Sequence, residues 1–186
     1  MPQTLPHSAP TAALPDAMGR HIGPGPVDAK VFRAIFQRHP ASATILTADD
    51  GTGPCAMTIT SLISLNADPA LVGFSLSHQS NSTKKILKAG RVAIHFLDPS
   101  HIALGRLCAT PGVDRFEDTT LWSRLADGTP RFHDVGCWFI ADIERTLELD
   151  GATFVAARLI EGVVDGERSA LLYASGGWRG LGEEIQ

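Results

Sequence analysis

The chain has 186 residues, with 16 Lys and Arg against 20 Asp and Glu, a formal net charge of −4 and 44% hydrophobic residues. This length suits one domain of ordinary size plus a tail, and the acidic balance leaves no excess of cations for a nucleic-acid backbone or an anionic membrane. We therefore expect one globular domain that binds neither nucleic acid nor membranes.

The cysteines and the first residues indicate where the protein works. Cys55, Cys108 and Cys137 lie far apart in the sequence and form no Cys-x-x-Cys pair, which argues against a disulfide framework and a thiolate zinc site. The first twenty residues lack the apolar run of a signal peptide, and no segment approaches the ~20 apolar residues of a membrane-spanning helix. We expect a cytoplasmic protein with reduced thiols.

The N-terminal part of the chain differs in composition from the rest. Residues 1–30 hold six of the twelve prolines, which predicts a flexible tail, followed by a domain at 31–181 and a short tail at 182–186. Apolar residues recur at spacings of three and four from Val27 to Phe36. This pattern predicts a lead-in helix that ends before Pro40 and packs on the domain.

The domain itself is predicted to be mostly strands. Segments 42–49 and 54–62 predict a hairpin, 70–77 a buried strand, and 80–90 a short helix that Gly90 ends. The sequence further predicts a strand at 91–97, a helical piece at 99–108, a loop at 111–135 and strands at 137–149, 153–164 and 169–174. Because strands and helices do not alternate regularly, we expect a mainly β fold, a closed or partly closed antiparallel barrel, and not a doubly wound sheet.

Conventional catalytic signatures are missing from the sequence. The motifs of esterases, zinc proteases and P-loop NTPases do not occur. His95 and His101 could bind a metal or act as acid and base, but no carboxylate or thiolate is spaced to complete such a site. We expect core or rim histidines and predict no metal.

A hydroxyl-rich helix start gives a clearer functional signal. Small polar residues occupy positions 80–83, where the predicted helix begins. The first turn of a helix offers unpaired backbone N–H groups and the positive end of the helix dipole, so this segment can bind one phosphate. A helix with generous capping and no ligand fits the same spacing equally well.

Several motifs in collinear order resemble those of the flavin reductase-like, FMN-binding split-barrel family. They are M-T-x-x-S at 57–61, S-L-x-x-D-P-x-L-V at 64–72, the polar run at 80–83, GVDRF at 112–116 and L-L-Y-x-x-G-G-W-R at 171–179. The resemblance covers about residues 31–181 and implies a split β-barrel with a few short helices. It also implies a homodimer that passes hydride from NADH or NADPH to FMN or FAD, often as the reductase component of a flavin-dependent monooxygenase.

The same resemblance implies roles for particular residues. Contacts to the flavin ring and ribityl chain are implied for Thr58, Thr60 and Ser61. The implied phosphate ligands are Ser77, Ser80, Asn81, Ser82 and Thr83. Residues that would border the ring or the nicotinamide, or reach across the dimer, are Arg115, Phe116, Tyr173, Trp178 and Arg179. For Phe116, Tyr173 and Trp178, ordinary core or interface packing is an equal alternative.

One departure from the family pattern affects the electron donor. Many members have Gly-Asp-His beside the nicotinamide site, where this chain has Gly151-Ala152-Thr153. Our first hypothesis is an NAD(P)H-dependent flavin oxidoreductase. An FMN-bound oxidoreductase with another donor and a non-catalytic flavin-binding protein are the alternatives. No catalytic side chain is named, because in flavin reduction the cofactor itself accepts the hydride.

Overall fold

The computed structural model describes residues 23–166 and 169–181, so residues 1–22 of the predicted tail and the tail at 182–186 lie outside the described residues. The chain divides into two units, Met1–Phe36 and Gln37–Gln186, which are treated separately. In the first unit, Asp28 Oδ1 accepts two backbone N–H groups at the start of helix α1 (Ala29–Phe36). The Phe32, Ile35 and Phe36 side chains of this helix are about half exposed. Its packing on the domain and the boundary at residue 31 stay predictions.

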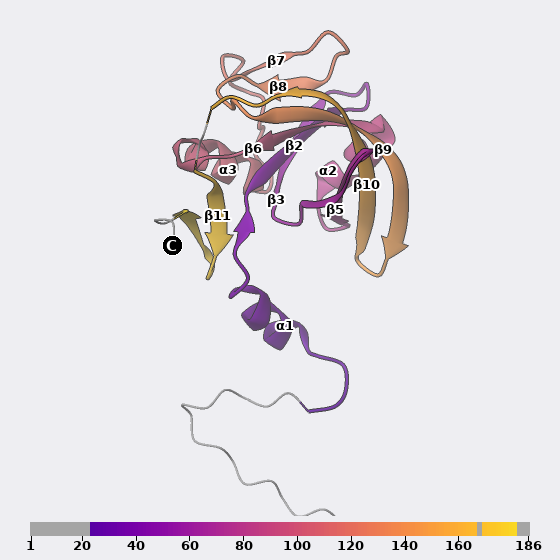
Figure 1. Ribbon diagram of the computed structural model, residues 1–186, viewed down its shortest axis with the longest axis vertical. Coiled ribbons are helices and arrows are strands. Elements are labelled where there is room, and N and C mark those ends of the chain that lie inside the picture. The colour runs from indigo at the N-terminus through magenta and orange to yellow at the C-terminus, as the bar shows by residue number, and fades with distance from the viewer. Residues whose placement is uncertain (1–22, 167–168, 182–186) are drawn as a thin grey trace, which may run out of the picture. The chain divides into compact units, whose positions relative to one another are not determined.

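The second unit is built on antiparallel strands (Figure 1). A seven-stranded sheet has the order β3-β2-β6-β9-β10-β5-β4. Its strands are β2 (Thr44–Asp49), β3 (Pro54–Ile59), β4 (Ile63–Ala67), β5 (Ala70–Ser77), β6 (Arg91–Phe96), β9 (Trp138–Leu149) and β10 (Ala152–Val163). A three-stranded sheet contains β1 (Ala41–Ser42), β11 (Leu171–Ala174) and β12 (Gly177–Gly180), and a hairpin contains β7 (Trp122–Arg124) and β8 (Pro130–Phe132). The expected mainly β architecture is confirmed.

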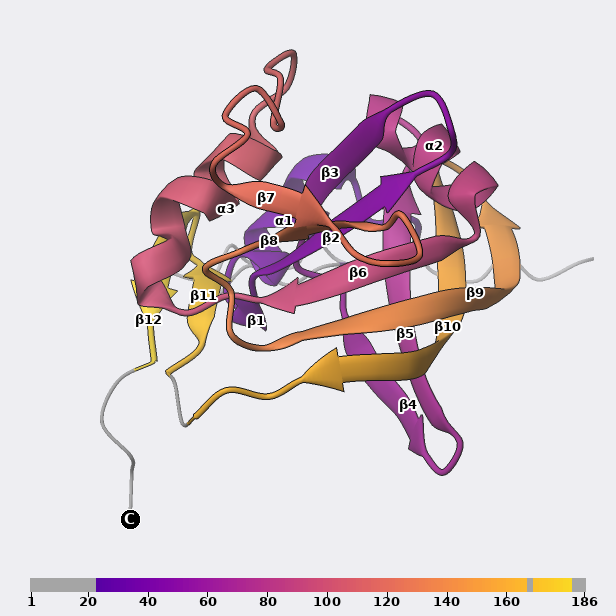
Figure 2. The same ribbon diagram turned by 90° about the horizontal axis from the view of Figure 1, so that it is seen from above.

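The large sheet curls around a core that helix α2 (Asn81–Ala89) helps to fill (Figure 2). Phe74 and Leu76 of β5 and Ile86 of α2 are fully buried in this core. The Ser61 hydroxyl bonds to both the backbone N–H and the carbonyl of Ser75, which brings the end of β3 to β5 although the two strands are not neighbours in the sheet. The result is a partly closed, split barrel.

A second core lies on the other face of β2. It is covered by a 3-10 turn, η1 (Pro99–His101), the helix α3 (Ile102–Ala109) that continues it, and the β7–β8 hairpin. Ile45 and Phe132 are fully buried there. The Thr47 hydroxyl, also fully buried, donates to the Pro130 carbonyl and so ties the hairpin to the barrel.

Local signals predicted some elements better than others. Strand 70–77 is confirmed, and the helix predicted at 80–90 is α2, with Ser80 as its N-cap and Gly90, at φ 70°, as its C-cap. Three expectations were incomplete: strand 54–62 ends at Ile59, the 111–135 loop contains the β7–β8 hairpin, and β4 and β12 were not predicted. These strands are short or wholly exposed, so pairing with neighbours forms them and no long apolar run marks them.

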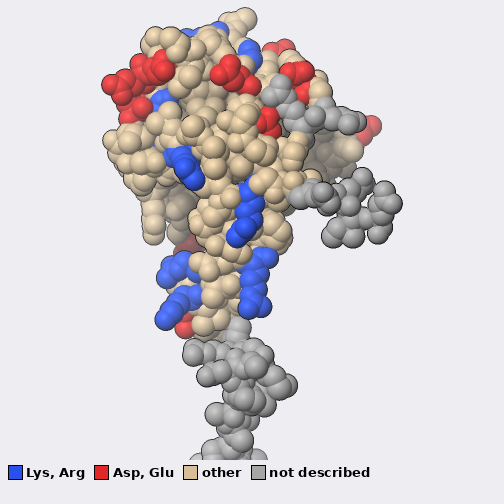
Figure 3. Space-filling view, turned by 90° about the vertical axis from the view of Figure 1, so that its left-hand side faces the viewer, with Lys and Arg blue, Asp and Glu red and all other residues tan. Residues whose placement is uncertain are grey.

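Charged side chains are sparse on one face of the molecule. On the face drawn in Figure 3, acidic and basic side chains form small separate groups, and uncharged residues occupy most of the area. Among residues 23–166 and 169–181, no helix has the length and apolar character needed to cross a bilayer.

Candidate functional site

A polar pocket of about 380 Å³ opens beside the start of α2. We call it the α2 pocket. Its wall comes from three segments that are distant in sequence: the end of β3, the β5–α2 turn, and the end of α3 with the loop after it. The lining residues are Met57, Thr58, Ser77, Gln79, Ser80, Asn81, Ser82, Cys108, Ala109, Pro111, Gly112 and Arg115. None of these described lining residues is an Asp or Glu, so the pocket carries no negative side chain.

The N-terminus of α2 supplies positive potential to this pocket. Ser80 has extended backbone geometry, and its Oγ accepts the N–H of Ser82 at 3.3 Å. The first turn contains no acidic residue, so the partial positive charge of the helix end is not compensated from within the helix. An anion in the pocket would meet this helix end directly.

The hydroxyl groups around the pocket divide into two sets. Thr58 Oγ1 donates to the Gly105 carbonyl at 2.8 Å, and Ser82 Oγ donates to the Ala56 carbonyl at 3.0 Å. These two hydroxyls are therefore used to fix β3 against α3 and α2. Ser77 and Ser80 instead accept backbone N–H groups, which leaves their own hydrogens free to turn toward a ligand.

Arg115 places a cation on the opposite wall. Its Nε donates to the Cys108 carbonyl at 3.1 Å, and one terminal nitrogen donates to the Thr110 carbonyl at 2.8 Å. These carbonyls lie at the C-terminal end of α3, where the helix dipole is negative and favours a cation. Because a guanidinium has five donor hydrogens, Arg115 keeps donors for a ligand after making both bonds.

The structure brings together about half of the residues that the resemblance implicated. Thr58, Ser77, Ser80, Asn81, Ser82 and Arg115 all line the α2 pocket. Thr83 is adjacent but buried, and its hydroxyl donates to the Ser77 carbonyl at 2.6 Å. Thr60 is exposed, and Ser61 is bonded to Ser75. Contacts of these three residues with a cofactor stay predictions.

The aromatic residues and Arg179 lie outside the α2 pocket. Phe116 is buried and packs against Phe132, with ring centroids 5.5 Å apart. Tyr173 and Trp178 pack edge to face at 5.5 Å, and Trp178 also covers Gly105, whose absent side chain leaves room for the indole. Arg179 is exposed. Their proposed contacts with flavin or nicotinamide therefore remain predictions too.

Sequence reasoning missed half of the pocket wall. Met57 belongs to a motif that had been noticed, and Gln79 lies inside the polar run, so both could have been included. Gly112 begins the GVDRF motif and could have been included as well. Cys108, Ala109 and Pro111 gave no local signal, because only the folded chain brings the end of α3 to α2. Burial raises the pKa of the Cys108 thiol to about 12, so it serves as an apolar wall and not as a nucleophile.

The two histidines considered as metal ligands are held by internal hydrogen bonds. His95 is fully buried between the Ile45 carbonyl and the Phe132 N–H, and burial lowers its pKa to about 4. His101 Nε2 lies 2.9 Å from the Asp134 carbonyl. Both serve as core or rim residues, and the described residues contain no group of three or more His, Cys, Asp or Glu arranged for a metal ion.

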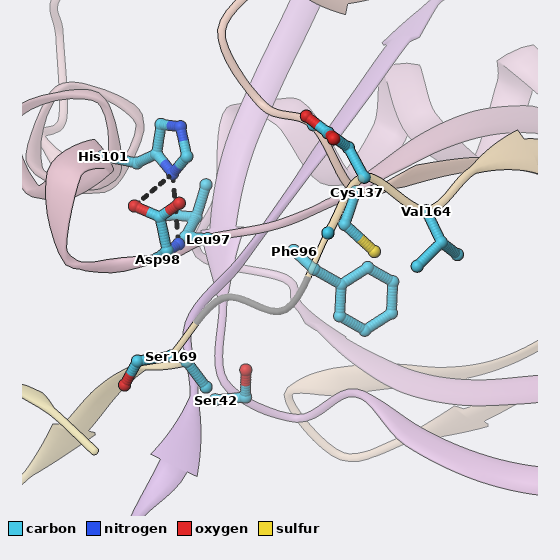
Figure 4. A pocket seen from close by; sticks show the side chains of 12 residues that line it. Ser42, Phe96, Leu97, Asp98, His101, Cys137, Val164 and Ser169 are labelled. Carbon is cyan, nitrogen blue, oxygen red and sulfur yellow. Dashed lines mark hydrogen bonds and ion pairs between the residues drawn. The ribbon is translucent and has the colours of Figure 1, made fainter. Parts of the chain in front are cut away.

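A second, smaller cavity of about 210 Å³ lies between the ends of β6 and β10. Figure 4 shows Asp98, Cys137 and Val164 around it, with His101 bonded to Asp98. His101 Nδ1 accepts the Asp98 backbone N–H at 3.1 Å, its Nε2 faces the Asp134 carbonyl, and Asp98 Oδ1 accepts the Ser100 N–H at 2.8 Å. None of the implicated cofactor residues lines this cavity.

Comparisons with known proteins identify the family of the chain. The family described as "Flavin reductase like domain" matches residues 36–182. A Rhodococcus qingshengii protein named NADH:FMN oxidoreductase is 32% identical over 149 residues, covering 78% of each chain. The structure of a flavin reductase domain protein from Arthrobacter sp. FB24 has a TM-score of 0.80 at 27% identity, covering 84% of this chain and 98% of that one. BorF, the flavin reductase component of a bacterial two-component tryptophan halogenase, has a TM-score of 0.75 at 26% identity, covering 84% and 100%.

Proposed function

The chain belongs to the family of flavin reductase-like domains, and from this premise we propose that it passes hydride from NADH or NADPH to FMN, with FAD as the alternative flavin. The observation that carries the proposal is the α2 pocket, where a helix N-terminus without acidic residues faces Arg115. The likeness to a protein named NADH:FMN oxidoreductase supports FMN and NADH as the first pair to test.

The groups in the pocket fit the phosphate of a flavin nucleotide. A phosphate monoester needs several hydrogen-bond donors and positive potential, and it is repelled by carboxylates. Backbone N–H groups at the start of α2, the hydroxyls of Ser77 and Ser80, and the Arg115 guanidinium provide the donors. The lining described above provides no carboxylate. We assign these residues to holding the phosphate, with Thr58 on the side toward the ring.

The chain's part in the reaction is binding and orientation. When bound, the flavin supplies the redox chemistry, since it takes up a hydride and later releases the electron pair. The α2 pocket fixes one end of the cofactor, so that the donor can approach the ring at near-attack distance. Thr58 and Ser82 keep β3, α2 and α3 together through their carbonyl bonds and so preserve the shape of the pocket. Hydride transfer requires no general base, and we assign none.

Partners are part of the proposal. A reductase component of a two-component halogenase among the similar structures supports a partner enzyme that consumes reduced flavin, and we propose a flavin-dependent monooxygenase in the cytoplasm. We also propose a homodimer. Ile63 and Leu65 on the edge strand β4, and Leu147 and Leu149 on β9, are 44–58% exposed, and apolar side chains at this density are typical of an interface. Sedimentation analysis of the purified protein at several concentrations tests the dimer.

A reductive titration tests the proposed activity. We expect FMN or FAD to bind the protein and its visible absorbance to bleach when NADH or NADPH is added without oxygen. Riboflavin, which lacks the phosphate, should bind more weakly than FMN. If neither donor bleaches either bound flavin, the reductase assignment is wrong.

A second candidate is an oxidoreductase of the same family with a different electron donor. Gly151-Ala152-Thr153 favours it, because Thr153 replaces the expected histidine and its hydroxyl is bonded to Glu148 at 2.8 Å. In this case FMN would bind and be bleached by dithionite, but not by either nicotinamide. Reduction by NADH at ordinary enzyme rates excludes this candidate.

A further inference from the structure

His78 lies between two residues of the α2 pocket but belongs to a different set of contacts. Ser77 and Gln79 line the pocket, whereas His78 is bonded to the β9–β10 hairpin. The backbone N–H of His78 donates to the Gly151 carbonyl at 3.0 Å, where the end of β5 meets the turn between β9 and β10 (Figure 2). The turn that presents Ser77 and Gln79 to the pocket is therefore attached to the barrel on its other side.

The side chain of His78 continues this attachment through a short chain of hydrogen bonds. His78 Nε2 is 3.0 Å from Thr153 Oγ1, and Thr153 Oγ1 donates to Glu148 Oε1 at 2.8 Å. Since the single hydroxyl hydrogen of Thr153 goes to the carboxylate, its oxygen accepts from His78, and Nε2 carries the hydrogen.

The burial of the three residues shows that Thr153 contributes most to these hydrogen bonds. Thr153 is 1% exposed, so its hydroxyl bonds are shielded from water. The side chains of His78 and Glu148 are 41% and 69% exposed. The 3.3 Å contact between His78 Nε2 and Glu148 Oε2 therefore lies at the surface, where such contacts contribute little. Without the Thr153 hydroxyl, the imidazole would keep only this weak contact.

The turn between His78 and α2 transmits any displacement to the pocket. Gln79 N donates to Ser77 Oγ, Ser80 N donates to the Ser77 carbonyl, and Ser80 then caps α2. A shift of the backbone at His78 therefore moves the Ser77 hydroxyl, which precedes it, and the Ser80 cap of α2, which follows it. Binding groups that must converge on one phosphate lose affinity when they are displaced by a fraction of an ångström.

We propose that His78 is a positioning residue of the α2 pocket, although it does not line the pocket itself. Its side chain, held by Thr153 and Glu148, fixes the β5–α2 turn so that the donors for the phosphate point to one place. This assignment rests on the proposed function, because it takes a phosphate-bearing flavin as the ligand. It gives Thr153 a role that does not involve contact with either the flavin or the electron donor.

The test compares FMN with riboflavin in variants at position 153. Thr153→Val keeps the side-chain shape and removes the hydroxyl. We expect it to weaken FMN binding about three- to tenfold in a fluorescence titration, with riboflavin affinity unchanged, because only FMN carries the phosphate. Thr153→Ser restores the hydroxyl and should restore FMN affinity. His78→Ala, at a half-exposed position that tolerates substitution, should reproduce the Thr153→Val effect.

A matched control separates positioning from stability. Thr47 is also a buried strand threonine with a donating hydroxyl, but it bonds to Pro130 away from the pocket. Thr47→Val should lower the stability of the fold in urea and leave the FMN-to-riboflavin affinity ratio as in the wild type. Equal FMN affinity in wild type, Thr153→Val and His78→Ala would overturn the proposal, and so would a parallel loss of riboflavin.

Hydrogen exchange makes the inference independent of flavin. Amide protection at residues 79–83 should fall in Thr153→Val and His78→Ala and return to the wild-type level in Thr153→Ser. Unchanged protection overturns the positioning role. If the wild type binds neither flavin, the proposed function fails, and this measurement still decides whether His78 sets the turn.

Discussion

Two helices of this barrel begin in opposite ways. At η1, the Asp98 carboxylate accepts the Ser100 N–H at 2.8 Å, and the Asp98 N–H donates to His101 Nδ1, so the chain satisfies its own helix start (Figure 4). At α2, the cap is the neutral Ser80, no acid lies in the first turn, and a pocket with Arg115 opens in front. A helix start that already holds a carboxylate has little affinity left for another anion. This difference is the reason why we propose α2, and not η1, as the place for a phosphate.

The largest expected effect is a loss of stability at low pH. It comes from His95, which is buried in the core that η1 and α3 cover. Burial lowers its pKa to about 4, from 6.5 in the unfolded chain. As the pH falls below 6.5, the unfolded chain takes up a proton that the folded chain refuses. The free energy of unfolding should therefore drop by about 3 kcal/mol between pH 7 and pH 4.

Urea unfolding at a series of pH values measures this loss. The variant His95→Gln keeps one donor and one acceptor but does not titrate, so the carboxyl groups and the other histidines account for its remaining pH dependence. The wild type should lose more stability than the variant over this range. Parallel curves for the two proteins would mean that His95 is not shielded as the structure shows.

Making α2 resemble η1 should abolish most of its preference for an anion. Ser80→Asp keeps a good N-cap but adds a negative charge at the pocket. We expect FMN affinity to fall about tenfold to a hundredfold, or about 1.4 to 2.8 kcal/mol. Riboflavin should bind as before. Ser80→Asn, a neutral cap, is the control, and a similar loss in that variant would point to the shape of the cap and not to its charge.

Removing the positive charge of Arg115 from the opposite wall of the α2 pocket should weaken FMN binding less than Ser80→Asp does. Arg115→Gln deletes the positive charge, and we expect FMN to bind about five- to tenfold more weakly, again without a change for riboflavin. Arg124→Gln is the matched control, since Arg124 is a half-exposed arginine paired with Asp49 away from the α2 pocket. An equal effect of both substitutions would indicate general electrostatic attraction and not a contact.

The smallest effect is expected at the satisfied helix start. Asp98→Ala removes the cap of η1 and should lower the free energy of unfolding by about 1 kcal/mol. FMN affinity should not change, because Asp98 does not line the α2 pocket. A gain of anion binding after this substitution would show that the carboxylate had been blocking a second site.

The same contrast explains what the sequence could predict. The cap residues, the helix and the strand before it follow from local chemistry at positions 70–90, and the structure has them within one residue. The β7–β8 hairpin does not follow, because its three-residue strands exist through pairing and through bonds such as that of Thr47 with Pro130. Long-range contacts leave no local pattern.

The residues of the α2 pocket also fall into a set that local sequence predicts and a set that depends on long-range contacts. The α2 half, which we propose holds the phosphate, was predicted from a run of hydroxyl-bearing residues next to one another in the sequence. The α3 half, from Cys108 to Gly112, depends on a fold that brings the end of α3 to the start of α2. The GVDRF motif therefore named Gly112 and Arg115 but did not place them on this wall, and it left out Cys108, Ala109 and Pro111. The attachment of His78 to Thr153 joins the β5–α2 turn to strand β10, and no local sequence pattern marks it.

Because the wall of the α2 pocket comes from three separate segments, the concentration of its ligand should affect how long the protein resists proteolysis. Because β3, the β5–α2 turn and the end of α3 meet only in the folded chain, an anion that fills the pocket binds the native state and not the unfolded one. At a ligand concentration one hundred times the dissociation constant, such binding adds about 2.7 kcal/mol to the free energy of unfolding. Proteases act on transiently opened molecules, so cells rich in the ligand would keep more of this protein than starved cells making it at the same rate.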